Sequence, residues 1–174
     1  RRDGKVSVAE DVRRNIIDKM IDAFSSKGLS IQDLVVLSGA HTIGASHCNA
    51  FNGRFTRDSK GNFELIDASL DNSYAETLMS QCSSSSSLTV SNDPETSSRF
   101  DNQYYRNLEA RKGLFHQTDS ALMEDDRTRK MVEDLASDEE SFFQRWRESF
   151  VKLSMVGVKV GEDGEIRRSC SSVN

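Results

Sequence analysis

Several features on which common protein classes depend are scarce in this sequence. No run of apolar residues approaches the roughly 20 that a membrane-spanning helix needs, so we expect no membrane insertion. The formal net charge is -5, which argues against nucleic acid as the main partner because phosphate groups are bound by basic surfaces. Hydrophobic residues make up only 36% of the chain and the mean hydropathy is -0.60, which is little for a self-sufficient core.

Cysteines are few and odd in number. Cys48, Cys82 and Cys170 cannot all pair within the chain, so one of them is free or has its partner elsewhere. The sequence also lacks an initiator methionine and a signal-peptide pattern, and we expect a chain that starts within a longer protein or is a processed piece. Its 174 residues are nevertheless enough for one domain with a hydrophobic core, and no repeat or linker divides them.

Helical periodicity is the main pattern that is present. Apolar residues three and four apart predict a first helix, which carries Ile16, Met20 and Phe24 on one face and is ended by Gly28. Capping and spacing predict four more helices: one over Asp71–Met79, one from Asp101 to Gly113, one capped by Asp126 and a longer one capped by Asp138. The expected fold class is therefore mainly α.

The last expected helix carries an apolar stripe, and the tail after it has a different pattern. Four large residues recur at helical spacing and are more often a core face than a cofactor contact: Phe142, Trp146, Phe150 and Leu153. From Val156 to Cys170, apolar and polar residues alternate as they do in a strand. This tail is expected to form a small β-like hairpin or an extended arm.

The stretch from Leu34 to Cys48 begins as an apolar helix and ends in glycines and small residues. Ser30 and Asp33 have the spacing of a capping box and predict the start of this helix. His41 stands at the other end between two glycines, where backbone or a flat ligand can come close. By itself such a histidine is either a core residue bonded to backbone or a neutral imidazole that ligates a metal or a haem iron.

The letters around His41 resemble a known motif. LVVLSGAHTIG, residues 34–44, is similar to the proximal-histidine motif of the plant secretory (class III) haem peroxidases, and the resemblance continues at matching positions to the C-terminus. It implies that residues 1–174 are the C-terminal, proximal domain of the haem peroxidase fold, incomplete, with the distal domain absent from this chain. Arg1–Gly4 resembles the family's GRRD turn without its first glycine. The family's longer, proline-containing stretch before the first helix is short here, and Pro94 is the only proline, so the substrate rim departs from the pattern.

The resemblance also implies a function. It is that of a secreted oxidoreductase of the cell wall or vacuole, which oxidises small phenolic donors with hydrogen peroxide and has haem b and calcium as cofactors. Its roles would be hydrogen peroxide catabolism and the response to oxidative stress. No catalytic residue is expected in this chain, because the family's distal histidine and arginine lie in the missing half. That half is the expected partner and would supply a cysteine for Cys170. The alternative is a truncated, catalytically inactive fragment that binds haem or calcium or only contributes structure.

Two residues are expected to serve the haem iron. The resemblance makes His41 the axial ligand and Asp119 the buried carboxylate that accepts a hydrogen bond from the other ring nitrogen of His41. Between Gly113 and Asp119 the chain has one residue more than the family pattern, near His116. This residue must be absorbed if Asp119 is to reach His41. Without the resemblance, Asp119 is a candidate helix N-cap.

A short acidic loop, residues 92–102, is the expected calcium site. Calcium takes about six to eight oxygen ligands. By resemblance they include the side chains of Thr42, Asp93, Thr96 and Asp101 and the backbone carbonyl of Arg99. Taken alone, this loop is a plain acidic turn. Asn92 stands where some family members have an aromatic ring against the proximal histidine, so that packing is expected to be absent.

The cysteines have three interpretations. The resemblance pairs Cys48 with Cys82 in a disulfide and leaves Cys170 for a partner in the missing half. Without the resemblance, His41, His47, Cys48 and Cys82 are a candidate zinc set, although no C-x-x-C pair is present. A nucleophilic pair of His47 and Cys48 is disfavoured because adjacent side chains diverge.

Overall fold

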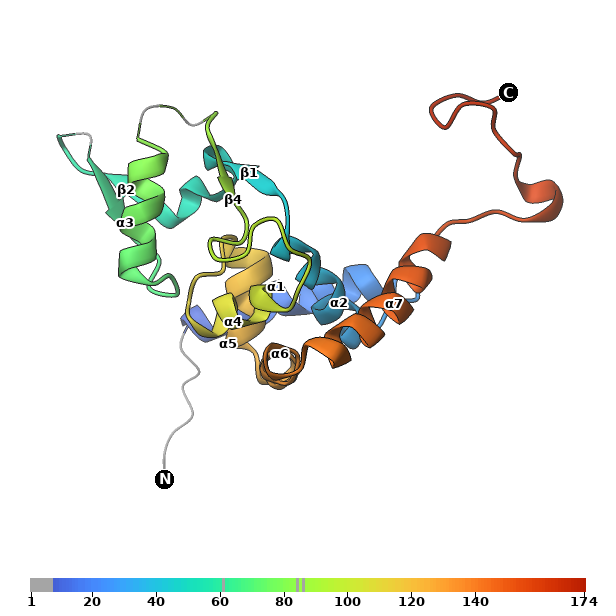
Figure 1. The fold of residues 1–174 in the computed structure, drawn as a ribbon, viewed down its shortest axis with the longest axis horizontal. Coiled ribbons are helices and arrows are strands. Elements are labelled where there is room, and N and C mark those ends of the chain that lie inside the picture. The colour runs from blue at the N-terminus through green and yellow to red at the C-terminus, as the bar shows by residue number, and fades with distance from the viewer. Residues whose placement is uncertain (1–7, 61, 84, 86) are drawn as a thin grey trace.

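The computed structural model describes residues 8–60, 62–83, 85 and 87–174, so the expected turn at Arg1–Gly4 lies outside the described residues. Helices form most of the body of the molecule (Figure 1), and the mainly α fold class is confirmed. They are α1 (Val8–Ser25), α2 (Ile31–Ser38), α3 (Asn72–Gln81), α4 (Gln103–Glu109), α5 (Ala121–Glu124), α6 (Asp126–Ser137) and α7 (Glu139–Met155). Among the described residues, none of these helices combines the length and the apolar character that a membrane crossing requires.

In the described ranges, four short strands form two antiparallel ribbons. Strand β1 (Ala45–His47) pairs with β4 (Thr89–Ser91), and β2 (Phe55–Arg57) pairs with β3 (Phe63–Leu65). The first ribbon therefore joins the residues that follow His41 to the segment that leads into the acidic loop.

The expected disulfide is confirmed. Cys48 is bonded to Cys82 with their Cα atoms 5.8 Å apart, which ties the 3₁₀ segment η2 (Cys48–Arg54) to the end of α3. Cys170 is free and exposed. Because both sulfur atoms of the pair are used in the bond, the zinc set and the cysteine nucleophile are wrong.

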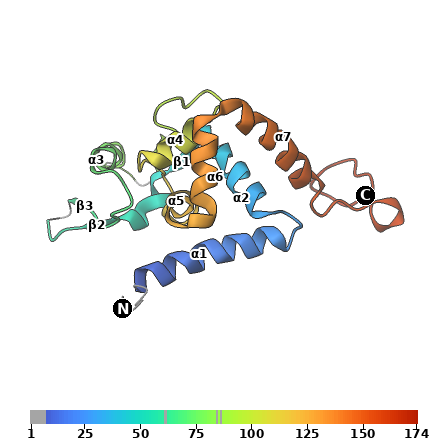
Figure 2. The ribbon, with the colours of Figure 1, turned by 90° about the horizontal axis from the view of Figure 1, so that it is seen from below.

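The end of α1 and the start of α2 lie at residues that the sequence marks. Helix α1 ends just before Gly28, whose φ of +75° a glycine adopts without strain. At the start of α2, the Ser30 hydroxyl accepts the Asp33 N–H at 3.1 Å, while Asp33 Oδ2 accepts the Ser30 N–H at 2.8 Å. These two bonds are the predicted capping box. Figure 2 shows α1 along one side of the helical body, where it packs against α2 and α5.

Two hydrophobic clusters stabilise the fold. The larger joins α1, α2 and α4–α7, and its buried members are Ile17, Val35, Val36, Tyr104, Tyr105, Leu108, Ala121, Leu122, Val132, Leu135, Ala136 and Phe142. The second lies around α3 and the disulfide, and its buried members are Cys48, Phe51, Leu70, Tyr74, Ala75, Leu78, Cys82, Val90 and Leu114. Leu114 belongs to one cluster and Leu122 to the other, so the segment between them, which contains Asp119, is anchored at both ends.

Several helix boundaries differ from the prediction: α3 runs to Gln81 rather than Met79, and α4 begins at Gln103 rather than Asp101. Helix α4 ends at Glu109 rather than at Gly113, because Arg111 adopts a φ of 59° and the Lys112 N–H bonds back to the Asn107 carbonyl at 2.7 Å. The N-cap of α6 is Asp125, one residue before the expected Asp126, and its side chain accepts the Arg127 N–H.

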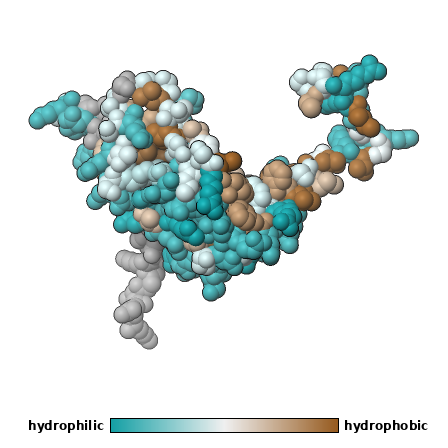
Figure 3. All heavy atoms as spheres, viewed as in Figure 1, coloured by the Kyte–Doolittle hydropathy of each residue, from teal (hydrophilic) through white to brown (hydrophobic). Residues whose placement is uncertain are grey.

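The apolar stripe of α7 is buried only in its first half. The helix starts at the predicted cap, Asp138, and Phe142 is completely buried. Phe150 and Leu153, however, are 51% and 41% exposed, so the prediction that they face the core is wrong in this structure. α7 leads away from the body and continues into the tail (Figure 1), and Figure 3 shows hydrophobic residues along both.

The tail forms the extended arm and not the hairpin. It contains one short helical turn, η4 (Gly161–Asp163), and no strand within the part that the structure describes. Its apolar residues Val158, Val160 and Ile166 are all more than half exposed.

Candidate functional site

His41 lies on η1 (Gly39–Thr42), a 3₁₀ turn that continues from the end of α2. Gly39 is required there, since a Cβ at this position would lie 2.5 Å from Tyr105 Oη and 2.8 Å from Phe142 Cε2. The absence of a side chain lets the turn pack directly against these two rings. His41 is thereby held at the edge of the larger hydrophobic cluster, with 36% of its side chain exposed.

The structure brings His41 and Asp119 together. Nδ1 of His41 lies 2.9 Å from Oδ1 of Asp119, which is almost fully buried. Burial lowers the pKa of His41, but the hydrogen bond to Asp119 and its negative charge outweigh that effect, and the net shift is upward. In the neutral ring the Nδ1–H group donates a hydrogen bond to the carboxylate, and Nε2 then carries a lone pair.

The other ring nitrogen is available. Among the described residues, Nε2 of His41 makes no hydrogen bond, and the ring is partly exposed. A neutral imidazole held by a carboxylate through one nitrogen is the arrangement in which histidine ligates metals and haem iron. The donor chemistry at His41 therefore fits an axial haem ligand.

Two aromatic rings flank His41. The Phe115 ring lies at a centroid distance of 5.2 Å and the Tyr104 ring at 5.9 Å, the latter edge-on. Asn92, where some family members are expected to have a ring, bonds to Ser46 and to the Ile43 carbonyl. The aromatic neighbours of His41 are therefore supplied by Phe115 and Tyr104.

The segment in which the resemblance predicts one extra residue before Asp119 forms a widened turn. Residues His116–Ser120 form η3, a π-helical turn, in which the Ser120 N–H reaches back five residues to the Phe115 carbonyl at 3.1 Å. A turn of this kind contains one residue more than an α-helical turn, and Asp119 still points at His41. His116 faces elsewhere, with Nδ1 2.9 Å from Asp67 Oδ2.

Arg54 holds this segment in place and was not singled out by its sequence. Its side chain is 2% exposed and bonds to Asp67 at 2.8 Å, to Ser120 Oγ at 2.8 Å and to the carbonyls of Gly113 and Leu114. A buried guanidinium with all these acceptors braces the backbone on both sides of Asp119. The role of Arg54 is visible only in the three-dimensional structure, because its partners lie 13 to 66 residues away in the chain.

The four side chains expected to bind calcium also meet. Thr42 Oγ1 lies 3.0 Å from Asp101 Oδ1 and 3.4 Å from Asp93 Oδ2, and Thr96 Oγ1 lies 2.9 Å from Asp93 Oδ2 and 3.2 Å from Asp101 Oδ1. Asp93 and Asp101 are both buried. Two buried carboxylates bridged by the same two hydroxyls repel each other, and a divalent cation would relieve that repulsion.

The donor set suits calcium better than a softer metal. The converging atoms are all oxygens, and no group of three or more His, Cys, Asp or Glu side chains capable of holding a metal occurs in the described ranges. Arg99 belongs to the same loop, but its side chain is 67% exposed and pairs with Glu139 at 3.1 Å and Asp101 at 3.5 Å. The structure therefore brings together two hydroxyls and two carboxylates at this loop.

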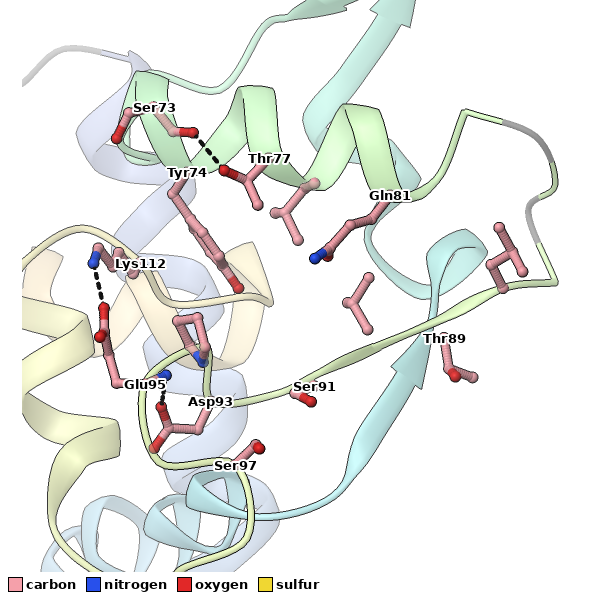
Figure 4. Close-up of a pocket in the computed structure, with 14 residues that line it drawn as sticks. Ser73, Tyr74, Thr77, Gln81, Thr89, Ser91, Asp93, Glu95, Ser97 and Lys112 are labelled. Carbon is pink, nitrogen blue, oxygen red and sulfur yellow. Dashed lines mark hydrogen bonds and ion pairs between the residues drawn. The ribbon is translucent and has the colours of Figure 1, made fainter.

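A polar groove of about 620 Å³ lies between α3, β4 and residues 93–97 of the acidic loop. Figure 4 shows Tyr74 reaching from α3 toward this loop, with Gln81 directed into the groove and Lys112 paired with Glu95 at its rim. The Tyr74 hydroxyl is buried without a hydrogen-bond partner among the described residues, and burial raises the pKa of Tyr74. Nothing in the sequence pattern pointed to this groove.

Comparison with known proteins supports the family resemblance. Residues 1–138 match the protein family described as Peroxidase. Over 182 aligned positions the chain is 85% identical to Peroxidase 46 of Arabidopsis thaliana, and it is 72% identical to Peroxidase 18 and 42% identical to Peroxidase 55 of the same plant. Each alignment covers 100% of this chain but only 56%, 55% and 54% of the relative. The chain thus spans about half the length of these relatives.

Proposed function

Because the chain belongs to the peroxidase family, among the class III plant peroxidases, we propose that it forms the proximal side of a haem site at which hydrogen peroxide oxidises small phenolic donors. The observation that carries this proposal is the geometry of His41, whose Nδ1 is bound by the buried Asp119 while Nε2 is left for a ligand. Haem b, when bound, supplies the iron chemistry by which peroxide is reduced and donors are oxidised.

The chain's own residues fix the ligand and set its electron-donating strength. Asp119 holds the proton on Nδ1 of His41, which selects the tautomer with a free Nε2 lone pair and increases the negative charge on the ring. The rings of Phe115 and Tyr104 restrict rotation of the imidazole. Arg54 and the two hydrophobic clusters hold the backbone that carries Asp119.

Calcium is proposed as the second cofactor. Its ligands would be the side chains of Thr42, Asp93, Thr96 and Asp101 with the backbone carbonyl of Arg99. Because Thr42 directly follows His41, a cation there would fasten the acidic loop to the turn that presents the haem ligand.

Residues 1–174 are proposed to be the proximal domain, incomplete by itself, with the distal histidine and arginine on the other half. The exposed apolar residues of α7 and the tail, together with the free Cys170, are proposed to contact that half. The Cys48–Cys82 disulfide supports a secreted protein of the cell wall or vacuole, because disulfides persist in oxidising compartments. Its role would be hydrogen peroxide catabolism and the response to oxidative stress.

Haem binding tests the proposal. The protein expressed from its whole reading frame should give a defined Soret band with haem and oxidise a guaiacol-type donor with hydrogen peroxide. His41→Ala should lose the band and the activity. His47→Ala is the matched control, because His47 is exposed and bonds only to the Ser87 carbonyl among the described residues. A His41→Ala variant with an unchanged spectrum would show that the assignment of the ligand is wrong.

A further inference from the structure

Oδ1 of Asp119 accepts from more than one group. Beside Nδ1 of His41 at 2.9 Å, the hydroxyl of Tyr104 donates to the same oxygen at 3.1 Å. The other oxygen, Oδ2, accepts the Phe115 N–H at 3.0 Å. The exposed Thr118 hydroxyl lies farther from Oδ1, at 3.4 Å. Asp119 and Tyr104 are 1% and 3% exposed, so solvent does not screen this arrangement.

Two donors on one carboxylate oxygen weaken each other. Each charge-assisted hydrogen bond draws negative charge from the oxygen, and the oxygen then attracts the second proton less strongly. The phenol of Tyr104 therefore reduces the pull of Asp119 on the Nδ1 proton of His41. The strength of that pull determines how much anionic character the imidazole has as a ligand.

We propose that Tyr104 is a positioning residue that limits, through the shared oxygen of Asp119, the electron donation of His41 to the haem iron. This inference rests on the proposed function, in which His41 is the axial ligand. Its sign is specific: the hydroxyl moderates the ligand and does not strengthen it. A role limited to filling space would be fulfilled equally well by phenylalanine.

Tyr105 offers a matched control. It is the neighbouring residue, it is completely buried, and its hydroxyl donates to the backbone carbonyls of Val35 and Val36 at 3.1 and 3.0 Å. Tyr105→Phe thus removes the same atom from the same helix without altering Asp119. The two variants separate an effect of the shared carboxylate from a general effect of losing a buried hydroxyl.

The test uses the haem-bound protein expressed from its whole reading frame. In Tyr104→Phe, the iron–histidine stretching frequency of the ferrous form, measured by resonance Raman, should rise, and the ferric–ferrous reduction potential should fall. Both quantities should stay at the parental values in Tyr105→Phe. Equal values in the parent and Tyr104→Phe would overturn the inference. So would shifts of the opposite sign, which would mean that the hydroxyl merely braces Asp119.

A haem-free measurement adds an independent readout. The Nδ1 proton resonance of His41 in ¹⁵N-labelled protein should move downfield in Tyr104→Phe, because its hydrogen bond to Asp119 becomes stronger, and should not move in Tyr105→Phe. An unmoved resonance in Tyr104→Phe would contradict the shared-oxygen argument. The absence of any iron–histidine band in the parent would refute the proposed function and this inference together, whereas a band that does not shift would refute only the inference.

Discussion

At the scale of single residues, the carboxylate of Asp119 joins the candidate haem ligand to the residues around it. It fixes the tautomer of His41, accepts from Tyr104 and is held by the Phe115 backbone. Asp119→Asn keeps the shape of the side chain but removes the charge that orients the imidazole. We expect about a 10- to 100-fold loss in affinity for haem, the range typical for a partner of a metal-bound histidine.

The measurement is a haem titration followed at the Soret band. Asp126→Asn is the control, since the Asp126 side chain is 93% exposed and lies outside the site. If the two variants bound haem equally well, Asp119 would have no role in holding the ligand.

Some of these residues could be predicted from the sequence and others could not. The motif at residues 34–44 and the capping box at Ser30 are local signals, because the partners lie within a few positions of each other. Tyr104 and Arg54 contact Asp119 or its segment through the tertiary fold, at sequence separations that carry no pattern. The Cys48–Cys82 bond came from the family resemblance, since an odd number of cysteines leaves the pairing open.

At the scale of elements, Asp33 links α2 to α7. Besides capping α2, it accepts from Ser149 Oγ at 2.8 Å and from Lys152 Nζ at 2.9 Å. Burial raises the pKa of Asp33, but the bonds from Lys152, Ser30 and Ser149 outweigh this and hold the pKa well below its ordinary value of 3.8. The ionised form is therefore favoured in the folded state.

This link predicts a pH-dependent stability difference. A carboxyl group whose pKa is lower in the folded than in the unfolded state stabilises the fold fully above its unfolded pKa. This stabilisation is lost as the pH falls below the unfolded pKa and through the folded one. Asp33→Asn should lower the free energy of unfolding by about 2 kcal/mol at pH 7, as expected for hydrogen bonds to a charged group. The difference from the parent should shrink below about pH 4.

Chemical denaturation at several pH values measures the difference in the free energy of unfolding between Asp33→Asn and the parent. Asp22→Asn, an exposed position on α1, should match the parent throughout. A difference for Asp33→Asn that stays constant down to pH 2 would show that its charge is not what links the helices.

The acidic loop gives a second prediction at this scale. A cation held by Thr42, Asp93, Thr96 and Asp101 would stabilise the folded state by about 2.7 kcal/mol at a hundredfold excess over its dissociation constant. For a chain of this size we expect chelation to lower the melting temperature by roughly 5–10 °C. Asp93→Ala should be insensitive to chelator.

Glu95→Ala is the control within the same loop, because the Glu95 side chain pairs only with Lys112 among the described residues and takes no part in the oxygen cluster. It should retain the full response to chelator. Identical melting of the parent with and without chelator would argue against calcium at this loop.

Element boundaries were predictable where one residue dictates them and not where two signals compete. Gly28 follows the end of α1 and Asp138 caps α7 as expected. Gly113 does not end α4, since Arg111 takes the left-handed conformation first and Gly113 serves close packing against Leu108 instead. In α7, periodicity identified the apolar face but not that its second half, with Phe150 and Leu153, would be exposed in this structure.

At the scale of the whole molecule, the chain alone is predicted to have no peroxidase turnover above that of free haem. Cleaving the peroxide bond needs a base that moves a proton between the two oxygens, and its loss costs about 100- to 10,000-fold. The remaining histidines are engaged elsewhere, His47 with the Ser87 carbonyl and His116 with Asp67. A positive group that stabilises the departing charge is needed as well.

The comparison requires the purified 174-residue chain and free haem at equal concentration, with the same phenolic donor. Adding the proposed distal half should restore turnover. Activity of the chain alone well above the haem background would mean that acid–base catalysis is supplied from within these residues.

The π turn at η3 bears on how a gene for such a chain can change over generations. Inserting one amino acid into a helix rotates everything after it by about 100°, which would ordinarily swing a downstream carboxylate away from its target. Here the π turn holds one residue more than an α-helical turn would, and Asp119 still lies 2.9 Å from His41. A change of one residue in length is therefore expected to be absorbed in this turn, directly beside the two side chains on which the proposed haem site depends.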